Sequence, residues 1–430
     1  MRQRLRDVAT SLAVIVVVAL GARVGFGWDQ ARKIPREALA TAPFEQETGS
    51  IAHALVTGKG FSNPFLKDTG PTAWLTPVYP LLVAATFKIL GVFTLSSFFF
   101  LFFFNAICSS AVCLPLYYVG KRVAGVGAGA LAAWLWAVFP SAVMMPFEWI
   151  WDTSLAAFLA AALLWATLEL PERELPLTRN WLLYGLLWGF TLMVNPSVGS
   201  LLPFYLGWAA YRWRKREAER SNASGSAPHV QPALALMVAI LCCVPWTVRN
   251  YVVFHRLVPL RSNFALELYI GNNGYSARWV NSALHPNHND EELAEYERVG
   301  EAAYMHHKSE QAKAFIRSHP GWFAWMTLRR IVYMWTGYWS CDHAYLKDEP
   351  LDPPNIFVDT TMSILALLGL RRVFQRNSSL AMRFAIVLVF FPLAYYFSHP
   401  ETYYFRPVDP LIVVLAAVTV AAGNREPAAV

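Results

Sequence analysis

Two pairs of carboxylates stand where the sequence predicts helix ends, and either pair could serve acid–base chemistry. The first pair is Glu45 and Glu47, which precede Ile51, Ala52 and Leu55 at helical spacing. Glu47 lies one turn before Ile51, so it falls on or near the face that turns inward. A carboxylate shielded from water has a raised pKa, which suits a general base. The structural alternative is that both acids only complement the dipole at the start of a helix.

The second pair is Glu148 and Asp152, which share the segment 146–152 with Trp149 and Trp151. Residues four apart share a face where the chain is helical. Acids beside aromatic rings at the edge of an apolar stretch are candidates for a functional site, and aromatic faces pack against sugars. The structural alternative is that Asp152 caps the helix that follows.

Three arginines could bind an anionic group, because a planar guanidinium matches the geometry of a phosphate. Arg249 directly follows one apolar stretch, and Arg406 directly precedes another. Arg261 lies in the polar segment between them. An arginine at a helix end also reaches the membrane surface from an apolar helix without binding anything.

Polar and aromatic residues complete the set of candidate binding residues. Asn272 lies in a short Asn- and Gly-rich segment, 269–274. Trp74 and Tyr79 lie in the rigid, proline-broken segment 69–80 that leads into an apolar stretch. The structural alternative for the two aromatic residues is that they anchor the chain at a membrane interface.

The composition shows what must position these residues. The chain is 56% hydrophobic and only 15% charged, and its mean hydropathy is +0.34. Soluble domains devote about a quarter of their residues to charge. The missing charge is replaced by apolar runs, many of them close to the length that crosses a bilayer. We therefore predict an all-α, polytopic transmembrane helical bundle forming a single domain over residues 1–430.

Basic clusters between the apolar runs set the topology, because lysine and arginine gather on the cytoplasmic side. About ten crossings place all these clusters inside, together with both chain termini. The net charge of +7 therefore indicates membrane topology, and we predict contact with membrane lipids and none with nucleic acid. The predicted crossings are residues 8–27, 96–119, 124–145, 153–170, 180–197, 199–213, 231–248, 354–370, 381–398 and 408–423.

Two further apolar segments, 74–93 and 322–339, do not fit as crossings, because counting either would move later basic clusters outside. We interpret them as interfacial or re-entrant helices on the outer face. The outer surface then holds a first loop, 28–95, and a large loop, 249–353, in which residues 290–319 read as a polar helix. The candidate acids and arginines all fall on this outer side. Cysteines and histidines show no ligand spacing, so we predict no metal site.

Taken together, these segments resemble membrane glycosyltransferases of the GT-C class, in particular the glycosyltransferase family 39-like group of aminoarabinose transferases and protein O-mannosyltransferases. The resemblance spans nearly the whole chain. The motifs that carry it are Glu47-x-Gly49-x-Ile51-Ala52-x-x-Leu55-x-x-Gly58-x-Gly60-Phe61, Thr69-Gly-Pro-Thr-Ala-Trp-Leu-Thr-Pro-Val-Tyr-Pro80, Pro245-Trp-Thr-Val-Arg-Asn250 and Tyr404-Phe-Arg-Pro-Val-Asp-Pro410.

The resemblance implies a polyprenyl-phosphate sugar donor and an inverting transfer on the periplasmic face of a bacterial inner membrane. The implied base is Glu47, with Glu45 as the neighbouring alternative, and the second acid is Asp152 or Glu148. The sequence departs from the family at 96–100, where no arginine follows the aromatic helix to meet the donor phosphate. Arg249, Arg261 and Arg406 remain the alternatives for that role. The resemblance allows a divalent metal ion, and we predict no cofactor.

Two other functions compete with this one. A transporter or flippase of lipid-linked glycans would carry ionisable residues near the middle of its spans, whereas here the acids stand at outer helix ends. A polymerase or ligase of finished glycans would differ only in its acceptor. The acceptor, whether lipid, protein or glycan, and the sugar itself are left open by the sequence.

Overall fold

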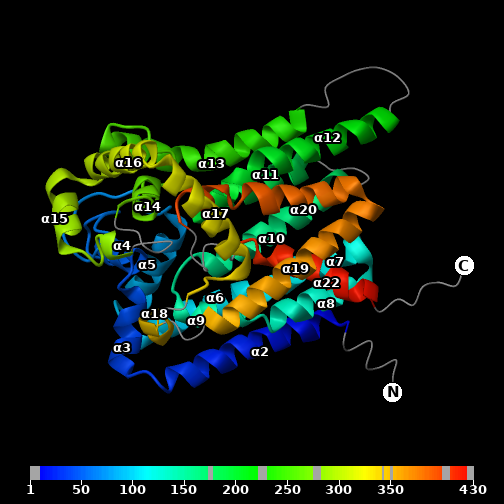
Figure 1. The fold of residues 1–430 in the computed structure, drawn as a ribbon, viewed down its shortest axis with the longest axis horizontal. Helices are drawn as coiled ribbons and strands as arrows, with labels where there is room; N and C mark the ends of the chain where they lie inside the picture. The colour runs from blue at the N-terminus through cyan, green and yellow to red at the C-terminus, as the bar shows by residue number, and fades with distance from the viewer. Residues whose placement is uncertain are drawn as a thin grey trace, which may run out of the picture.

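A computed structural model describes residues 10–172, 178–220, 230–274, 282–340, 343–348, 352–399 and 407–423. The regular structure of these residues is helical, and extended pairing is limited to an isolated bridge between Ser62 and Pro71. Long helices run beside one another along the molecule, and short helices gather at one end (Figure 1). The all-α helical bundle expected from the sequence is confirmed.

Helices lie at all ten predicted crossings. Their bounds are α2 (Leu12–Ala31), α6 (Leu95–Ala111) followed by α7 (Cys113–Ala124), α8 (Val126–Ala137) followed by α9 (Pro140–Glu148), α10 (Thr153–Glu169), α11 (Thr178–Val194), α12 (Leu202–Arg220), α13 (Val230–Phe254), α19 (Asp352–Arg376), α20 (Ser378–Phe390) followed by α21 (Leu393–Phe397), and α22 (Asp409–Gly423).

Length and apolarity alone qualify a smaller number of these helices as membrane spans. Among the described residues four stretches qualify: Leu12–Ala31, Leu95–Ala124, Val230–Phe254 and Ser378–Phe397. The pair α8 and α9, bent by 41° where Pro140 begins α9, would make a fifth. Others, such as α10 and α22, are apolar but shorter. The count of ten crossings therefore stays a prediction.

The two ends of the bundle differ. The first turn of α2, the last turn of α22 and the adjoining ends of α12 and α13 lie at one end (Figure 1). The opposite end holds the short helices α3 (Arg36–Thr41), η1 (Ala42–Phe44), α4 (Glu47–Val56), α14 (Phe264–Gly271), α15 (Asp290–Val299) and α16 (Glu301–Ser318). The first and last described helices thus begin and end on the side away from Glu47, the first residue of α4.

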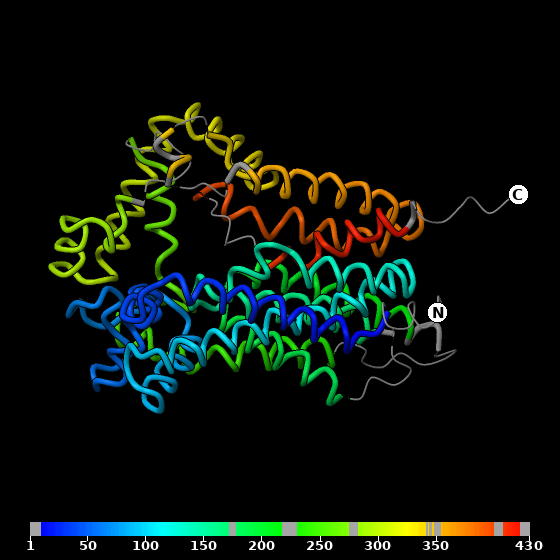
Figure 2. Tube along the Cα trace, turned by 90° about the horizontal axis from the view of Figure 1, so that it is seen from below, coloured from blue at the N-terminus to red at the C-terminus, as the bar shows by residue number. Residues whose placement is uncertain are grey.

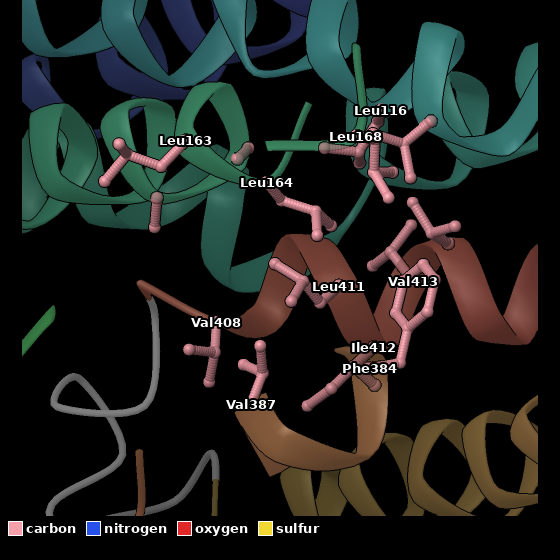
Figure 3. Packing of buried hydrophobic residues seen from close by; sticks show 14 of the residues in the cluster. Leu116, Leu163, Leu164, Leu168, Phe384, Val387, Val408, Leu411, Ile412 and Val413 are labelled. Carbon is pink, nitrogen blue, oxygen red and sulfur yellow. The ribbon is translucent and has the colours of Figure 1, made fainter. Parts of the chain in front are cut away.

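The core is built around α22, which is apolar on all sides and almost wholly buried. Leu411 and Val413 pack between Leu163 and Leu116 on one side and Phe384 on the other (Figure 3). A tube view separates the group formed by α19, α20 and α22 from the N-terminal helices, with α22 facing them (Figure 2). The last helix therefore joins the two halves of the bundle.

The segments that do not fit as crossings form α5 (Val78–Leu90) and α17 (Pro320–Thr336). Their interfacial position stays a prediction. The single polar helix expected over 290–319 is wrong: α15 and α16 are separate helices, because Gly300 stands between them at φ 75°. The remaining elements are η2 (Leu170–Glu172), η3 (Pro196–Leu201), η4 (Ser282–Leu284) and α18 (His343–Asp348).

Candidate active site

A cavity of about 790 Å³ lies where the short helices meet the ends of the long ones. Its wall comes from the start of α4, the segment before α5, the loop between α9 and α10, η3, the segment leading into α14, residues 285–288 and the region around α21. Of the predicted site residues, Glu47, Asp152, Arg261, Trp74 and Tyr79 line it. Segments far apart in sequence are thus brought together.

Glu47 is the first residue of α4 and is buried. Its Oε1 lies 3.4 Å from Asn287 Nδ2 and 3.4 Å from His285 Nε2, both from the large loop. Burial raises the pKa of Glu47 to about 7, and nearby Glu267 adds to this. A carboxylate with this pKa can take up a proton near neutral pH, which a general base must do.

Gly49 explains how α4 comes so close to η1. A Cβ atom at Gly49 would collide with the carbonyl oxygen of Phe44, which belongs to η1. Only glycine permits this approach, and the turn so formed places Glu47 inside the cavity while Glu45 stays exposed. The spacing Glu47-x-Gly49 therefore has a steric cause.

Asp152 stands between α9 and α10, at the N-cap position of α10, but its side chain makes no capping bond. The carboxylate instead accepts a hydrogen bond of 3.1 Å from Asn195 Nδ2. Burial raises the pKa of Asp152 to about 6, although Arg261 and Asn195 oppose the shift. The N-cap alternative for this residue is thereby not supported by the structure.

Arg261 brings a positive charge to these acids. Its Nε donates to the carbonyl oxygen of Trp74 at 3.0 Å, and its charge lowers the pKa values of Glu47 and Asp152 against the larger effect of burial. A guanidinium beside two carboxylates in a cavity can hold an anionic group between them. Among the described residues that line the cavity, Arg261 is the lone arginine.

Arg249 does not line the cavity. Its guanidinium donates to the carbonyl oxygens of Thr72, at 2.6 Å, and of Phe61, at 2.7 Å. From the other side the buried Glu301 accepts from Ala73 N, at 2.7 Å, and from the hydroxyl of Thr72. Burial raises the pKa of Glu301. Arg249 and Glu301 thus hold the segment that carries Trp74.

The other predicted site residues lie elsewhere. Asn272 is buried and donates to the carbonyl oxygens of Leu268 and Phe397, both at 2.8 Å, so it joins α14 to α21. Glu45 and Glu148 are exposed and do not line the cavity. Arg406 lies outside the described residues. Tyr79 lines the cavity, and its hydroxyl donates to Asn105 Oδ1 at 2.9 Å.

Sequence reasoning missed Glu267, Asn195 and His399, which all line the cavity. The signal for Glu267 was a lone acid in the apolar stretch 264–271, four residues after Asn263, which donates to it at 2.9 Å. Asn195 and His399 gave no such signal, because their partners are distant in sequence.

The donors in the cavity do not fit a metal site. No three His, Cys, Asp or Glu side chains among the described residues lie close enough together to hold an ion. Glu267 is bonded to His399 at 2.7 Å.

Comparison with known proteins gives a likeness in fold. No protein family and no curated protein matches the sequence. The fold resembles those of solved structures, among them the oligosaccharyltransferase of Archaeoglobus fulgidus with Zn and sulfate (13% identity, TM-score 0.51) and the archaeal oligosaccharyltransferase AglB of the same organism with an inhibitory peptide and a dolichol-phosphate (15% identity, TM-score 0.52). Each match covers 96% of this chain. The chain spans about half of those proteins, 48% and 50%.

These matches show that the chain has a GT-C-like fold, as expected from the sequence. The narrower resemblance to the family 39-like group stays a prediction.

Proposed function

We propose that this protein is a glycosyltransferase that moves a sugar from a polyprenyl-phosphate donor to an acceptor at the membrane surface. The observation that carries the proposal is the cavity that Glu47, Asp152 and Arg261 line together, at the end of an apolar helical bundle. The GT-C-like fold supports it. The proposal includes the periplasmic face of a bacterial inner membrane, both termini in the cytoplasm, and a lipid, protein or glycan acceptor.

The chemistry follows from the carboxylate of Glu47 and the guanidinium of Arg261. Glu47 accepts the proton of the acceptor O–H or N–H while the acceptor atom attacks the anomeric carbon. The bond from that carbon to the phosphate oxygen breaks, and the polyprenyl phosphate leaves with the bonding electrons. Arg261 stabilises the charge that develops on the phosphate. A single displacement of this kind inverts the anomeric centre.

Asp152 provides a second carboxylate, which orients hydroxyl groups of the sugar or acceptor. Hydrogen bonds to an ionised acid are stronger than those to a neutral one, so this role is best served by the carboxylate form. Trp74, Tyr79 and Trp151 give the cavity the aromatic surface that a sugar ring packs against. Arg249 and Asn272 do not bind substrate in this proposal. They hold the backbone around the site in place, since both donate to backbone carbonyl oxygens away from the cavity.

The test uses the purified chain in lipid nanodiscs with a panel of radiolabelled polyprenyl-phosphate sugars and membrane extract as acceptor. Wild type is compared with Glu47→Gln and with Glu45→Gln. Removing a general base costs about 10²–10⁴ in rate. We expect that loss for Glu47→Gln and near wild-type transfer for Glu45→Gln, because the exposed Glu45 lies outside the cavity.

Two results would contradict the proposal. If Glu45→Gln is inactive and Glu47→Gln is active, the class stands but the base is wrong. If wild type moves labelled donor across a vesicle membrane and forms no glycosidic bond, the protein is a transporter.

A further inference from the structure

Asn195 links two parts of the cavity wall. It follows the last turn of α11 and caps η3, and its Oδ1 accepts from the backbone N–H of Ser197 at 3.1 Å. The Ser197 hydroxyl donates to the same oxygen. A backbone N–H can only donate, so this bond fixes which end of the amide is the oxygen. The NH₂ group must then face the carboxylate of Asp152, at 3.1 Å.

We infer that Asn195 is a positioning residue, which aims the Asp152 carboxylate into the cavity and keeps it ionised. The inference rests on the proposed function, because it assigns Asp152 a role in transfer. Asn195 acts through Asp152, and its own orientation is set by the start of η3. Asn195, which caps the start of η3, thus also donates a hydrogen bond to Asp152 in the site.

The surroundings of Asp152 show why such a donor matters. Burial favours the neutral acid. The charged and titratable groups that face Asp152 are Arg261, from the segment before α14, Tyr79 of α5 and Tyr395 of α21. Arg261 favours the ionised acid, and a neutral amide donor adds to this without placing a second cation beside the donor phosphate.

The test variant is Asn195→Asp. Aspartate is also a preferred N-cap and still accepts from Ser197 N, so the start of η3 is kept. It replaces the donor with a second carboxylate, and two carboxylates at hydrogen-bond distance share a proton, so that one pKa rises strongly. The quantity measured is the ratio of transfer by Asn195→Asp to transfer by wild type, from pH 6 to 9. The titration of Glu47 affects both and cancels in the ratio.

We expect the ratio to be highest at pH 6, where the introduced carboxyl holds the shared proton and donates it to Asp152 as the amide does. It should fall about tenfold or more toward pH 9, where both carboxylates are ionised and no donor is left, since one pKa unit is a factor of ten. The matched control is Asn377→Asp. Asn377 caps α20 by accepting from Leu380 N at 3.0 Å and does not line the cavity. Its ratio should stay near one at every pH.

A reduced ratio that does not change with pH would overturn the inference, because it would make Asn195 a structural cap alone. If Asn195→Asp does not fold, Asn195→Ser decides, because serine keeps a capping oxygen but has no amide to donate. Without that donor the ionised form of Asp152 is less favoured, so the ratio for Asn195→Ser should fall at low pH, and a flat ratio overturns the inference. If wild type transfers no label, the proposed function fails instead, and the two failures are distinguishable.

Discussion

His399 Nε2 lies 2.7 Å from Glu267 Oε2 in the wall of the cavity and joins the end of α21 to α14. The two residues are 132 positions apart. Arg330 of α17 supports the same junction, since it donates to the carbonyl oxygens of Gly271, in α14, and of Phe397, at 3.2 Å. The large loop and the C-terminal helices are thereby held to each other at the cavity wall.

Replacing Glu267 with Gln should destabilise the protein by about 1.5–3 kcal/mol, the usual value for a hydrogen bond to a charged group. Burial alone would raise the pKa of Glu267, but the hydrogen bond and charge of His399, together with His285 and Arg261, outweigh it and the pKa is lowered from 4.5. A lowered pKa in the folded state stabilises the fold above the unfolded value and loses that effect as pH falls through the folded pKa. The difference in melting temperature should therefore be full at pH 6 and shrink below pH 4.5.

The control for this prediction is Glu310→Gln, since Glu310 forms an exposed ion pair with Lys313 on α16. No measurable change in melting temperature is expected for Glu310→Gln. Equal shifts for the two variants would show that the Glu267–His399 bond contributes nothing particular.

Transfer should depend on pH through Glu47. The base acts as a carboxylate, so the rate should rise as pH increases through about 7, the pKa of Glu47. The raised pKa of Glu47 has the opposite effect on stability. The contribution of Glu47 to the free energy of unfolding is full below the pKa that it has in the unfolded chain, and it is lost as pH rises through the pKa that it has in the folded protein. Glu47→Gln should therefore be more stable than wild type at pH 8, by a free energy of unfolding on the order of 3 kcal/mol, while losing activity. A variant that melts lower at pH 8 would contradict the burial effect.

The roles of two arginines can be separated by lysine substitutions. Arg261→Lys should raise the KM for the polyprenyl-phosphate donor with little change in melting temperature, because a planar contact to phosphate is lost. Arg249→Lys should lower the melting temperature and leave the donor KM near wild type, because lysine cannot bond both Thr72 and Phe61 as the guanidinium does. The reverse pattern would indicate that Arg249, and not Arg261, binds the donor phosphate.

Gly49→Ala should displace α4 from η1, because the new methyl group would occupy the place of the Phe44 carbonyl oxygen. We expect destabilisation of about 1–3 kcal/mol, as for overpacking, and a loss of transfer from the shift of Glu47. Gly21→Ala is the control, since nothing lies within 4 Å of a Cβ there, and alanine favours a helix. Equal stability of the two variants would contradict the steric reason for Gly49.

The sequence by itself determined the helical class and the positions of the long helices. Apolar runs of this length can only be satisfied as helices in a bilayer, so composition and spacing suffice. It also singled out Glu47, in a short motif with a glycine close to an acid, and Trp74, in a proline-broken segment, because both are local signals. Local patterns could not show the break at Gly300, where a positive φ stops one helix and starts the next.

Only the tertiary structure decided which charged groups face one another. Arg249 and Arg261 look alike in sequence, but the first is used to hold the backbone of Thr72 and the second lines the cavity. Glu267 meets His399, and Asn195 meets Asp152, through contacts between segments far apart in the chain. Such pairings depend on how the helices pack, and helix packing is set by the whole apolar surface of each helix, which no short stretch of sequence contains.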